Sequence, residues 1–239
     1  MDNRYYFSNQ KEDQVIIDGQ EFQHLTRVRR AKVDDEIVGF NGDGFDYQLK
    51  IFEINKINAV CDIISKSQNK ALNKPNINVY LASIKSDALN EALDNLTQLN
   101  IANISVFTSD YTNVKYDDRK REKLTAHFIQ SCKQCERADI PSIRFIKFDE
   151  MIQEVKTKDL SLFAYENAEE NFLNVNFKNY KNKSIAIIVG GEGGFSSSEA
   201  EELSKFAKRV SLGKTILRAP VAVTAIASAV LANLGEWHR

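Results

Sequence analysis

The fold is decided by one stretch near the end of the chain, Ile185-Ala186-Ile187-Ile188-Val189-Gly190-Gly191-Glu192-Gly193-Gly194-Phe195-Ser196-Ser197-Ser198-Glu199. Its first five residues are all apolar, which is typical of a strand buried on both faces of a parallel sheet. Four glycines around one glutamate follow, and the Ser196-x-x-Glu199 spacing indicates a capping box that begins a helix. Ligands of open α/β sheets bind outside the carboxyl ends of the strands, so this loop is a candidate binding site. A tight strand-to-helix turn without a ligand explains the spacing about equally well.

The glycine spacing limits the kind of ligand that this loop could hold. It matches neither G-x-G-x-x-G nor G-x-x-x-x-G-K-[ST], so the two common phosphate-binding loops are excluded. Glu192 in the loop would also repel a pyrophosphate group. A ligand that offers hydroxyl groups, an adenine ring or a positive centre fits the loop better.

Strands and helices alternate along most of the remaining chain. The apolar spacing predicts strands at 77–82, 104–108, 143–146, 161–165, 184–189 and 209–212, and helices at 84–99, 120–137, 197–207 and 221–234. This alternation predicts an α/β fold with a parallel sheet. The last helix is apolar all round, so it must be buried against the sheet or against a second subunit.

The first seventy residues have a different pattern. Short stretches rich in β-branched and aromatic residues lie at 15–17, 36–40, 47–52 and 59–64, with Asp18-Gly19 and Asn41-Gly42-Asp43-Gly44 as turn signals between them. They predict a small β-barrel or sandwich. Residues 65–76 are mostly polar and contain a proline, which is typical of a linker. The chain is therefore expected to form two domains, residues 1–70 and 75–239.

The composition argues against several classes of protein and of site. No apolar run approaches the roughly 18 residues that span a bilayer, and the N-terminus lacks a secretory signal, so no membrane association is expected. The chain has three cysteines, a small and odd number that does not fit a disulfide framework. Because disulfides are typical of oxidising compartments, this favours a cytoplasmic protein. The Cys132-x-x-Cys135 spacing has no second pair of ligands nearby, so no metal site is expected.

The charge is nearly balanced overall but uneven along the chain. With 32 Lys and Arg against 33 Asp and Glu, a net charge of -1 excludes a strongly basic nucleic-acid-binding domain. Residues 24–32 nevertheless carry +4 and residues 203–235 carry +5, with no acidic residue in either segment. Each alone is best explained as a solvated charged surface. One in each expected domain favours an RNA partner, whose binding would be salt-sensitive.

Two C-terminal segments together resemble a known family. Val-Gly-Gly-Glu-Gly-Gly-Phe-Ser at 189–196 and Ser-Leu-Gly-Lys-Thr-Ile-Leu-Arg-Ala at 211–219 resemble the signature of bacterial 16S rRNA uridine-N3 methyltransferases, members of the SPOUT superfamily. His24-Leu-Thr-Arg-Val-Arg-Arg30 and Gln134-Cys-Glu-Arg137 with Ile140-Pro141 resemble further motifs of that family. Gly191 stands where the family commonly has proline, Pro220 where it has glutamate, and residues 92–101 lack its usual Lys…Glu-Leu-Gly pattern.

The resemblance implies a fold, a cofactor and a substrate. The fold would be a PUA-like RNA-binding β-barrel at 1–70 and a SPOUT α/β domain at 75–239, with a trefoil knot in roughly 160–239. The protein would be a homodimer that uses S-adenosyl-L-methionine to methylate N3 of one uridine in 16S rRNA of the assembled small ribosomal subunit. A non-catalytic RNA-binding assembly factor and a methyltransferase for another RNA, such as tRNA, are the alternatives.

The resemblance also assigns site residues by position. The cofactor-binding residues would be Phe163, Ala164, Tyr165, Glu166, Gly190, Gly191, Glu192, Gly193, Gly194, Leu212, Gly213, Ile216, Leu217 and Arg218. The rRNA-binding residues would be Arg4, His24, Arg27, Arg29, Arg30 and Lys32. Arg218 is the catalytic candidate, because a cation would stabilise the imidate charge that develops as uracil N3 loses its proton. Its alternative role is to bind a phosphate or brace the loop, and the sequence identifies no general base.

Overall fold

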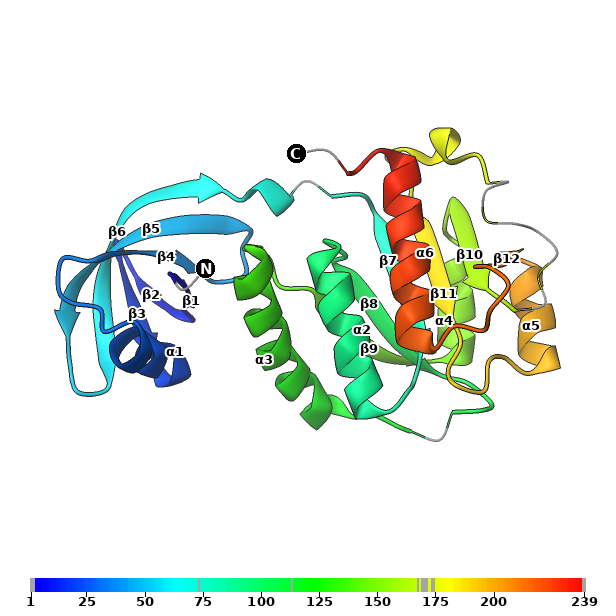
Figure 1. The fold of residues 1–239 in the computed structure, drawn as a ribbon, viewed down its shortest axis with the longest axis horizontal. Coiled ribbons are helices and arrows are strands. Elements are labelled where there is room, and N and C mark those ends of the chain that lie inside the picture. The colour runs from blue at the N-terminus through cyan, green and yellow to red at the C-terminus, as the bar shows by residue number, and fades with distance from the viewer. Residues whose placement is uncertain are drawn as a thin grey trace. The chain divides into compact units, whose positions relative to one another are not determined.

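The computed structural model describes residues 3–72, 74–112, 114–166, 168, 172 and 175–237. The chain forms two compact units, which are described separately below. The first contains residues 3–72 together with Ile129–Ile140, and the second contains residues 74–128 and the described chain from Pro141 onward (Figure 1).

The first unit is built on a curled six-stranded sheet (Figure 1). Its strands run in the order β1-β4-β5-β6-β3-β2, and only the β1–β4 pair is parallel. Their bounds are β1 Arg4–Tyr6, β2 Asn9–Lys11, β3 Gln14–Asp18, β4 Glu36–Phe40, β5 Phe45–Ile54 and β6 Asn58–Gln68. Alternate side chains, including Val15, Ile17, Leu49 and Ile51, are fully buried and form the core of this unit.

Two details of the first unit differ from the sequence-based expectation. The predicted linker is wrong at residues 65–68, because β6 continues to Gln68 and pairs there with Phe45–Gln48 of β5. Hydrogen bonds between strands do not require apolar side chains, so an exposed polar segment can still complete a ladder. The chain between β3 and β4 also forms a short helix, α1 (Gly19–Gln23), and a π-helical turn, η1 (His24–Val28), which is anchored by the buried Leu25.

The second unit contains a six-stranded sheet in which every pair is parallel, with the order β12-β10-β11-β7-β8-β9. Its strands are β7 Ile77–Ala82, β8 Asn103–Thr108, β9 Ser142–Lys147, β10 Leu160–Ala164, β11 Ile185–Val189 and β12 Lys208–Val210. Its helices are α2 Ser86–Gln98, the first part of α3 Asp118–Cys135, α4 Phe148–Val155, α5 Ser197–Ser204 and α6 Ala219–Leu234, with the short 3-10 segment η4 Phe177–Tyr180. The end of α3 from Ile129 onward and the 3-10 segment η2 Lys70–Leu72 belong to the first unit. The predicted α/β class is confirmed, whereas α4 was not expected.

Helices cover both faces of this parallel sheet. On one face, Met151 and Ile152 of α4 and Leu203 of α5 pack with Ala186 and Ile188 of β11. On the other, α6 contacts both β11 and α2 (Figure 1). β11 is apolar and buried at all five positions, as expected for a strand covered on both faces. Among the described residues, no helix has the length and apolar character needed to cross a membrane.

The strand order determines which loops come together. β11 lies between β10 and β7, and β12 lies beyond β10. Because all strands are parallel, the segments that follow β10, β11 and β12 leave the same edge of the sheet, and so do those that follow β7 and β8. The glycine-rich segment after β11 therefore has neighbouring loops on both sides.

Candidate functional site

A pocket lies at the carboxyl ends of β10, β11 and β12, and is called here the first pocket. It is lined by Ala164, Tyr165, Glu166, Val189, Gly190, Gly191, Gly194, Phe195, Ser211, Leu212, Gly213, Lys214, Thr215, Ile216, Leu217, Ala219 and Ala222. These residues come from three segments that are far apart in the sequence. Strand order alone brings them together.

Two glycines of the first pocket, Gly190 and Gly194, are favoured by the backbone geometry of the turn. A Cβ on Gly190 would lie 3.1 Å from the carbonyl carbon and 3.2 Å from the Cα of Gly194, and 3.2 Å from the Phe195 ring. Gly194 donates its N–H to the Gly191 carbonyl at 3.1 Å and has a φ of +67°, which favours glycine. The loop is thus a tight backbone turn whose surface is open to a ligand at Gly190, Gly191 and Gly194.

Hydrogen bonds to α5 hold this turn in place. The Ser196 hydroxyl accepts from the Glu199 N–H at 3.3 Å, and the Glu199 carboxylate accepts from the Ser196 N–H at 3.0 Å, which forms the predicted capping box. Glu199 also accepts from the N–H of Asp110 at 2.9 Å, and Ser196 donates to the Asp110 carboxylate at 2.6 Å. The buried Glu199 therefore ties the loop after β11 to the loop after β8.

The polar groups of the first pocket are few and of both signs. A Cβ placed on Gly194 would lie 3.7 Å from a carboxylate oxygen of the exposed Glu166, so this acid faces the glycine turn. Lys214 and Thr215 contribute a cation and a hydroxyl from the segment after β12. Apolar strand ends, exposed backbone and a single carboxylate suit a ligand that combines a ring, hydroxyl groups and a positive centre.

The structure places most of the predicted cofactor residues around the first pocket. Ten of them line it, namely Ala164, Tyr165, Glu166, Gly190, Gly191, Gly194, Leu212, Gly213, Ile216 and Leu217. Phe163 is fully buried in the core, and Glu192 and Gly193 line a different pocket. Arg218 precedes α6 with a side chain 73% exposed, and it lies 3.7 Å from Glu91.

Sequence reasoning did not single out the other lining residues of the first pocket. These are Val189, Phe195, Ser211, Lys214, Thr215, Ala219 and Ala222. All but Ala222 are next in the sequence to a predicted cofactor-binding residue. Adjacency to those residues is therefore the sequence signal that could have identified them. Ala222 lies one helical turn into α6, and only the packing of α6 reveals its position.

A second pocket lies on the other side of the glycine loop, at the carboxyl ends of β7, β8 and β11. Its lining residues are Ser83, Lys85, Asp110, Tyr111, Val114, Glu192 and Gly193. Ser83 is only 4% exposed, and its hydroxyl has no hydrogen-bond partner among the described residues. Lys85, Tyr111 and Glu192 are exposed. No sequence motif predicted this group of side chains.

The residues predicted to bind rRNA differ in accessibility. Arg27, Arg30 and Lys32 are exposed, Arg29 is half-buried, and His24 is half-buried with its ring 5.7 Å from that of Tyr5. Arg4 differs from them: it is buried, its guanidinium pairs with Asp46 at 2.5 Å, and it lies 4.9 Å from the centre of the Phe40 ring. The exposed members remain suited to contact a phosphate backbone.

The basic C-terminal segment is less uniform than its charge sum indicates. Lys205 pairs with Glu202, an acid that lies just outside the basic segment. Arg209 lies 5.2 Å from the centre of the Tyr165 ring and donates to Ser204. Lys214 lines the first pocket. These side chains do not form one basic surface of the kind that counting charges along the chain implies.

The cysteine pair is structural. Cys61 and Cys132 are buried and Cys135 is half-buried, and all three are free thiols. Burial raises the pKa of the Cys132 thiol to about 12, and burial also raises the pKa of Cys135. No group of potential ligands suited to a metal ion occurs within the part of the chain that the structure describes.

Comparison with known families matches both units. The family described as the RNA methyltransferase domain matches residues 71–231, and the family described as the RNA methyltransferase PUA domain matches residues 17–64. The first match covers more than half of the chain and includes every residue of the first pocket.

Individual relatives agree with these families. The ribosomal RNA small subunit methyltransferase E of Rickettsia conorii is 32% identical over 233 residues, which cover 94% of this chain and 93% of that protein. The protein of the same name from Bacillus subtilis is 28% identical, covering 90% and 88%. A crystal structure of the Neisseria gonorrhoeae protein of that name, bound to S-adenosyl methionine, shares the fold with a TM-score of 0.84 at 20% identity, covering 96% of this chain and 97% of that one.

Proposed function

This chain belongs to the ribosomal RNA small subunit methyltransferase E family of RNA methyltransferases, and we propose that it uses S-adenosyl-L-methionine to methylate N3 of one uridine in 16S rRNA. The observation that carries the proposal is the first pocket, where the segments after β10, β11 and β12 converge on a glycine turn. The resemblance of residues 189–196 and 211–219 to uridine-N3 methyltransferases supports the choice of N3.

The residues of the first pocket fit this cofactor. The turn at Gly190 has no room for a side chain, so a ligand there meets backbone. Glu166 would accept hydrogen bonds from ribose hydroxyls, and the apolar Leu212, Ile216 and Leu217 would contact the adenine ring. When bound, the cofactor supplies a methyl group on a positively charged sulfur, which is a good leaving group. The protein supplies orientation and electrostatics.

The remaining parts of the proposal concern Arg218 and the assembly. We retain Arg218 as the catalytic candidate, because Arg218 directly follows Leu217 of the first pocket in the sequence and its side chain is exposed. The trefoil knot is part of the proposal through the family resemblance of residues 189–196 and 211–219. Most apolar side chains of α6 are buried, but Val221 is exposed, which supports a homodimer. The proposed substrate is the assembled small subunit, so the reaction would take place in the cytoplasm.

The proposal is tested by mapping modified nucleosides in rRNA from a strain that lacks this protein. We expect 3-methyluridine to disappear from the small subunit and to return when the wild-type chain is restored. Restoration with Arg218→Ala is expected to fail, although calorimetry should show that this variant binds S-adenosyl-L-methionine normally. An unchanged nucleoside map in the deletion strain would refute the proposed function.

The competing function is an RNA-binding assembly factor that does not catalyse methylation. The exposed Arg27, Arg30 and Lys32 in the first unit would serve either role. Calorimetry separates the two, because an assembly factor of this kind has no need to bind the cofactor. Absence of binding at millimolar S-adenosyl-L-methionine would favour the assembly factor.

A further inference from the structure

We propose that the second pocket holds the acceptor uracil, with Lys85 stabilising its negative charge and Glu192 removing the N3 proton. This inference rests on the proposed function and names the acceptor site for it. The family resemblance places Glu192 among the cofactor-binding residues, and the sequence identifies no general base. The structure places Glu192 on the opposite side of the glycine loop from the first pocket.

The position of the second pocket is the first argument. β11 lies between β10 and β7, so its glycine loop borders both pockets. Gly190, Gly191 and Gly194 face the first pocket, whereas Glu192 and Gly193 face the second. Methyl transfer requires the reacting atoms to approach to about 3–3.5 Å, so the acceptor must bind next to the cofactor. The second pocket adjoins the first, because Gly191 lines the first and the next two residues, Glu192 and Gly193, line the second.

The polar groups of the second pocket are the second argument. The hydroxyl of Ser83 is buried without a hydrogen-bond partner among the described residues, and such a group is unfavourable unless a ligand binds it. The side chains of Lys85 and Glu192 are exposed, and neither makes an ion pair or a hydrogen bond to another described side chain. The pocket thus offers two hydrogen-bond donors, Ser83 and Lys85, and a carboxylate acceptor.

Uracil is the base that these groups fit. Its pairing edge carries two carbonyl oxygens and the N3–H, so it needs donors for the oxygens and an acceptor for N3–H. Tyr111, whose side chain is 55% exposed, offers a ring surface for stacking of an unpaired base. A Cβ on Gly193 would lie only 3.0 Å from the Cβ of Tyr111, so the glycine lets this residue pack against the loop.

The electrostatic surroundings of Glu192 are mixed. Within the pocket it shares space with Lys85, Asp110 and Tyr111. Tyr116 lies nearby and donates its hydroxyl to the Ile84 carbonyl at 2.5 Å. Burial is the main cause that raises the pKa of this hydroxyl, and the negative charges of Glu192 and Asp87 raise it further. Tyr116 therefore stays protonated at neutral pH and does not compete as a base.

The proposed step balances in atoms and charge. Glu192 takes the N3 proton, and the N3 electron pair forms the new N–C bond to the methyl carbon. The electron pair of the broken S–C bond returns to sulfur. The products are 3-methyluridine, S-adenosylhomocysteine and a protonated Glu192 that returns its proton to water. Lys85 lowers the energy of the anionic uracil from the side of the second pocket, in addition to the role proposed for Arg218 beside the first pocket.

The experiment compares Glu192→Gln and Lys85→Met with the matched surface controls Glu201→Gln and Lys181→Met. Methyl transfer is measured on small subunits from a strain that lacks the modification, and cofactor binding is measured separately by calorimetry. We expect each pocket variant to lose about 100-fold in kcat, as for removal of a general base or of a charge-stabilising group. Cofactor Kd should stay within twofold, and both controls should match the wild type.

The pH profile distinguishes a base from a structural residue. The rate of Glu192→Gln should rise about tenfold per pH unit toward alkaline pH, because hydroxide then removes the N3 proton, while the wild-type rate levels off. Pocket variants that keep activity within threefold would overturn the inference. So would loss of cofactor binding in Glu192→Gln, which would return Glu192 to the cofactor site. If the wild type itself transfers no methyl group, the proposed function fails first.

Discussion

Adjacent glycines in the loop after β11 have different physical roles. Gly190 faces backbone, since its absent Cβ would lie 3.1 Å from the carbonyl carbon of Gly194. The nearest atom to a Cβ on Gly191 is the Ser83 carbonyl oxygen at 3.6 Å, which is an ordinary contact, and Gly191 does not have a positive φ. This explains why Gly191 can stand where the resembling family commonly has proline. Only Gly190 is required by packing.

We therefore expect Gly190→Ala to be the more damaging of two matched substitutions. The added methyl group forces the turn apart, which costs about 1–3 kcal/mol of unfolding free energy and distorts the first pocket. Gly191→Ala should change stability by less than about 0.5 kcal/mol. Urea denaturation measures the stability of both variants, and calorimetry measures their affinity for S-adenosyl-L-methionine. Equal stability of the two variants would contradict this account of the loop.

At the scale of elements, α4 is held to the sheet by a polar network. The Arg144 guanidinium on β9 donates to both carboxylate oxygens of Glu154 on α4, at 2.8 and 2.7 Å. It also donates to Ser105 on β8, and the fully buried Tyr80 on β7 donates its hydroxyl to Glu154 at 2.9 Å. Sequence reasoning missed α4, although Phe148, Met151, Ile152 and Val155 have helical spacing. Eight residues give too short a pattern to stand out.

This network predicts a pH dependence of stability. The hydrogen bonds from Arg144, and then that from Tyr80, hold the pKa of Glu154 below its usual value of 4.5. A carboxyl whose pKa is lower in the folded state stabilises the protein above the unfolded pKa, and this contribution is lost as pH falls through the folded value. Glu154→Gln should therefore be less stable than wild type at pH 7, and this deficit should shrink below pH 4.5.

Chemical denaturation at pH 7 and at successively lower pH measures that deficit. The side chains of Arg144 and Glu154 are both partly exposed, so the loss of stability in Glu154→Gln should be modest. We expect about 0.5–1 kcal/mol at neutral pH, and less in high salt. Glu150→Gln is a less suitable control, because Glu150 accepts a hydrogen bond from the Lys147 N–H at the start of α4. The exposed Glu201→Gln should show no change in stability between these conditions. A deficit that grows on acidification would contradict the prediction.

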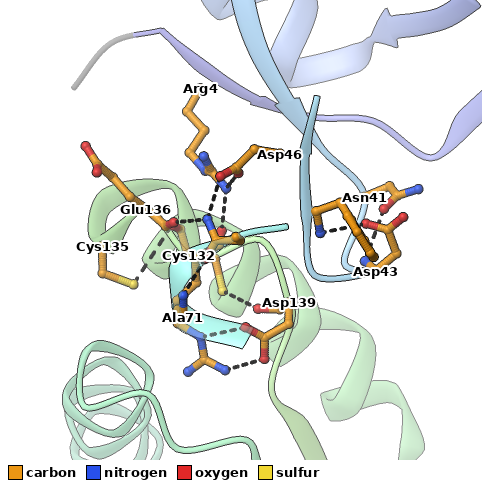
Figure 2. Close-up of polar contacts among 12 residues, drawn as sticks. Arg4, Asn41, Asp43, Asp46, Ala71, Cys132, Cys135, Glu136 and Asp139 are labelled. Atoms are coloured by element: carbon orange, nitrogen blue, oxygen red, sulfur yellow. Dashed lines mark hydrogen bonds and ion pairs between the residues drawn. The ribbon is translucent and has the colours of Figure 1, made fainter. Parts of the chain in front are cut away.

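At the scale of the whole molecule, a segment from far along the chain completes the N-terminal unit. Residues Ile129–Ile140, the end of α3 and the loop after it, pack with residues 3–72. Cys132 and Ala138 join the buried Phe40, as one apolar cluster. In the polar part of this contact, Arg4 donates to Asp46 and to the Arg137 carbonyl, and the Asn69 amide donates to Asp46 and to the Glu136 carbonyl. Figure 2 shows Arg4, Asp46 and Glu136 close together. A boundary drawn along the sequence cannot represent such a unit.

Asp46 is the centre of that contact, so its removal should destabilise the protein. Asp46→Ala leaves the Arg4 guanidinium, which is 10% exposed, without a counter-charge, and the expected cost is about 3 kcal/mol of unfolding free energy. Glu53→Ala, an exposed carboxylate on the same strand, is the control and should cost less than about 0.5 kcal/mol. Thermal and urea denaturation measure both variants. If Asp46→Ala loses no more unfolding free energy than Glu53→Ala, the ion pair between Arg4 and Asp46 does not stabilise the protein.

The sequence by itself determined the strand and helix alternation, the glycine turn and its capping box, because these features depend on local backbone preferences and on the spacing of apolar side chains. It also indicated most of the first pocket, although through resemblance to a family. Only the tertiary structure decided that β11 lies between β10 and β7, that Glu192 faces away from the first pocket, and that Arg4 is buried against Asp46. Strand order, and the pairing of charges from distant segments, arise from contacts between residues far apart in the chain. Such contacts leave no periodic signal in the sequence.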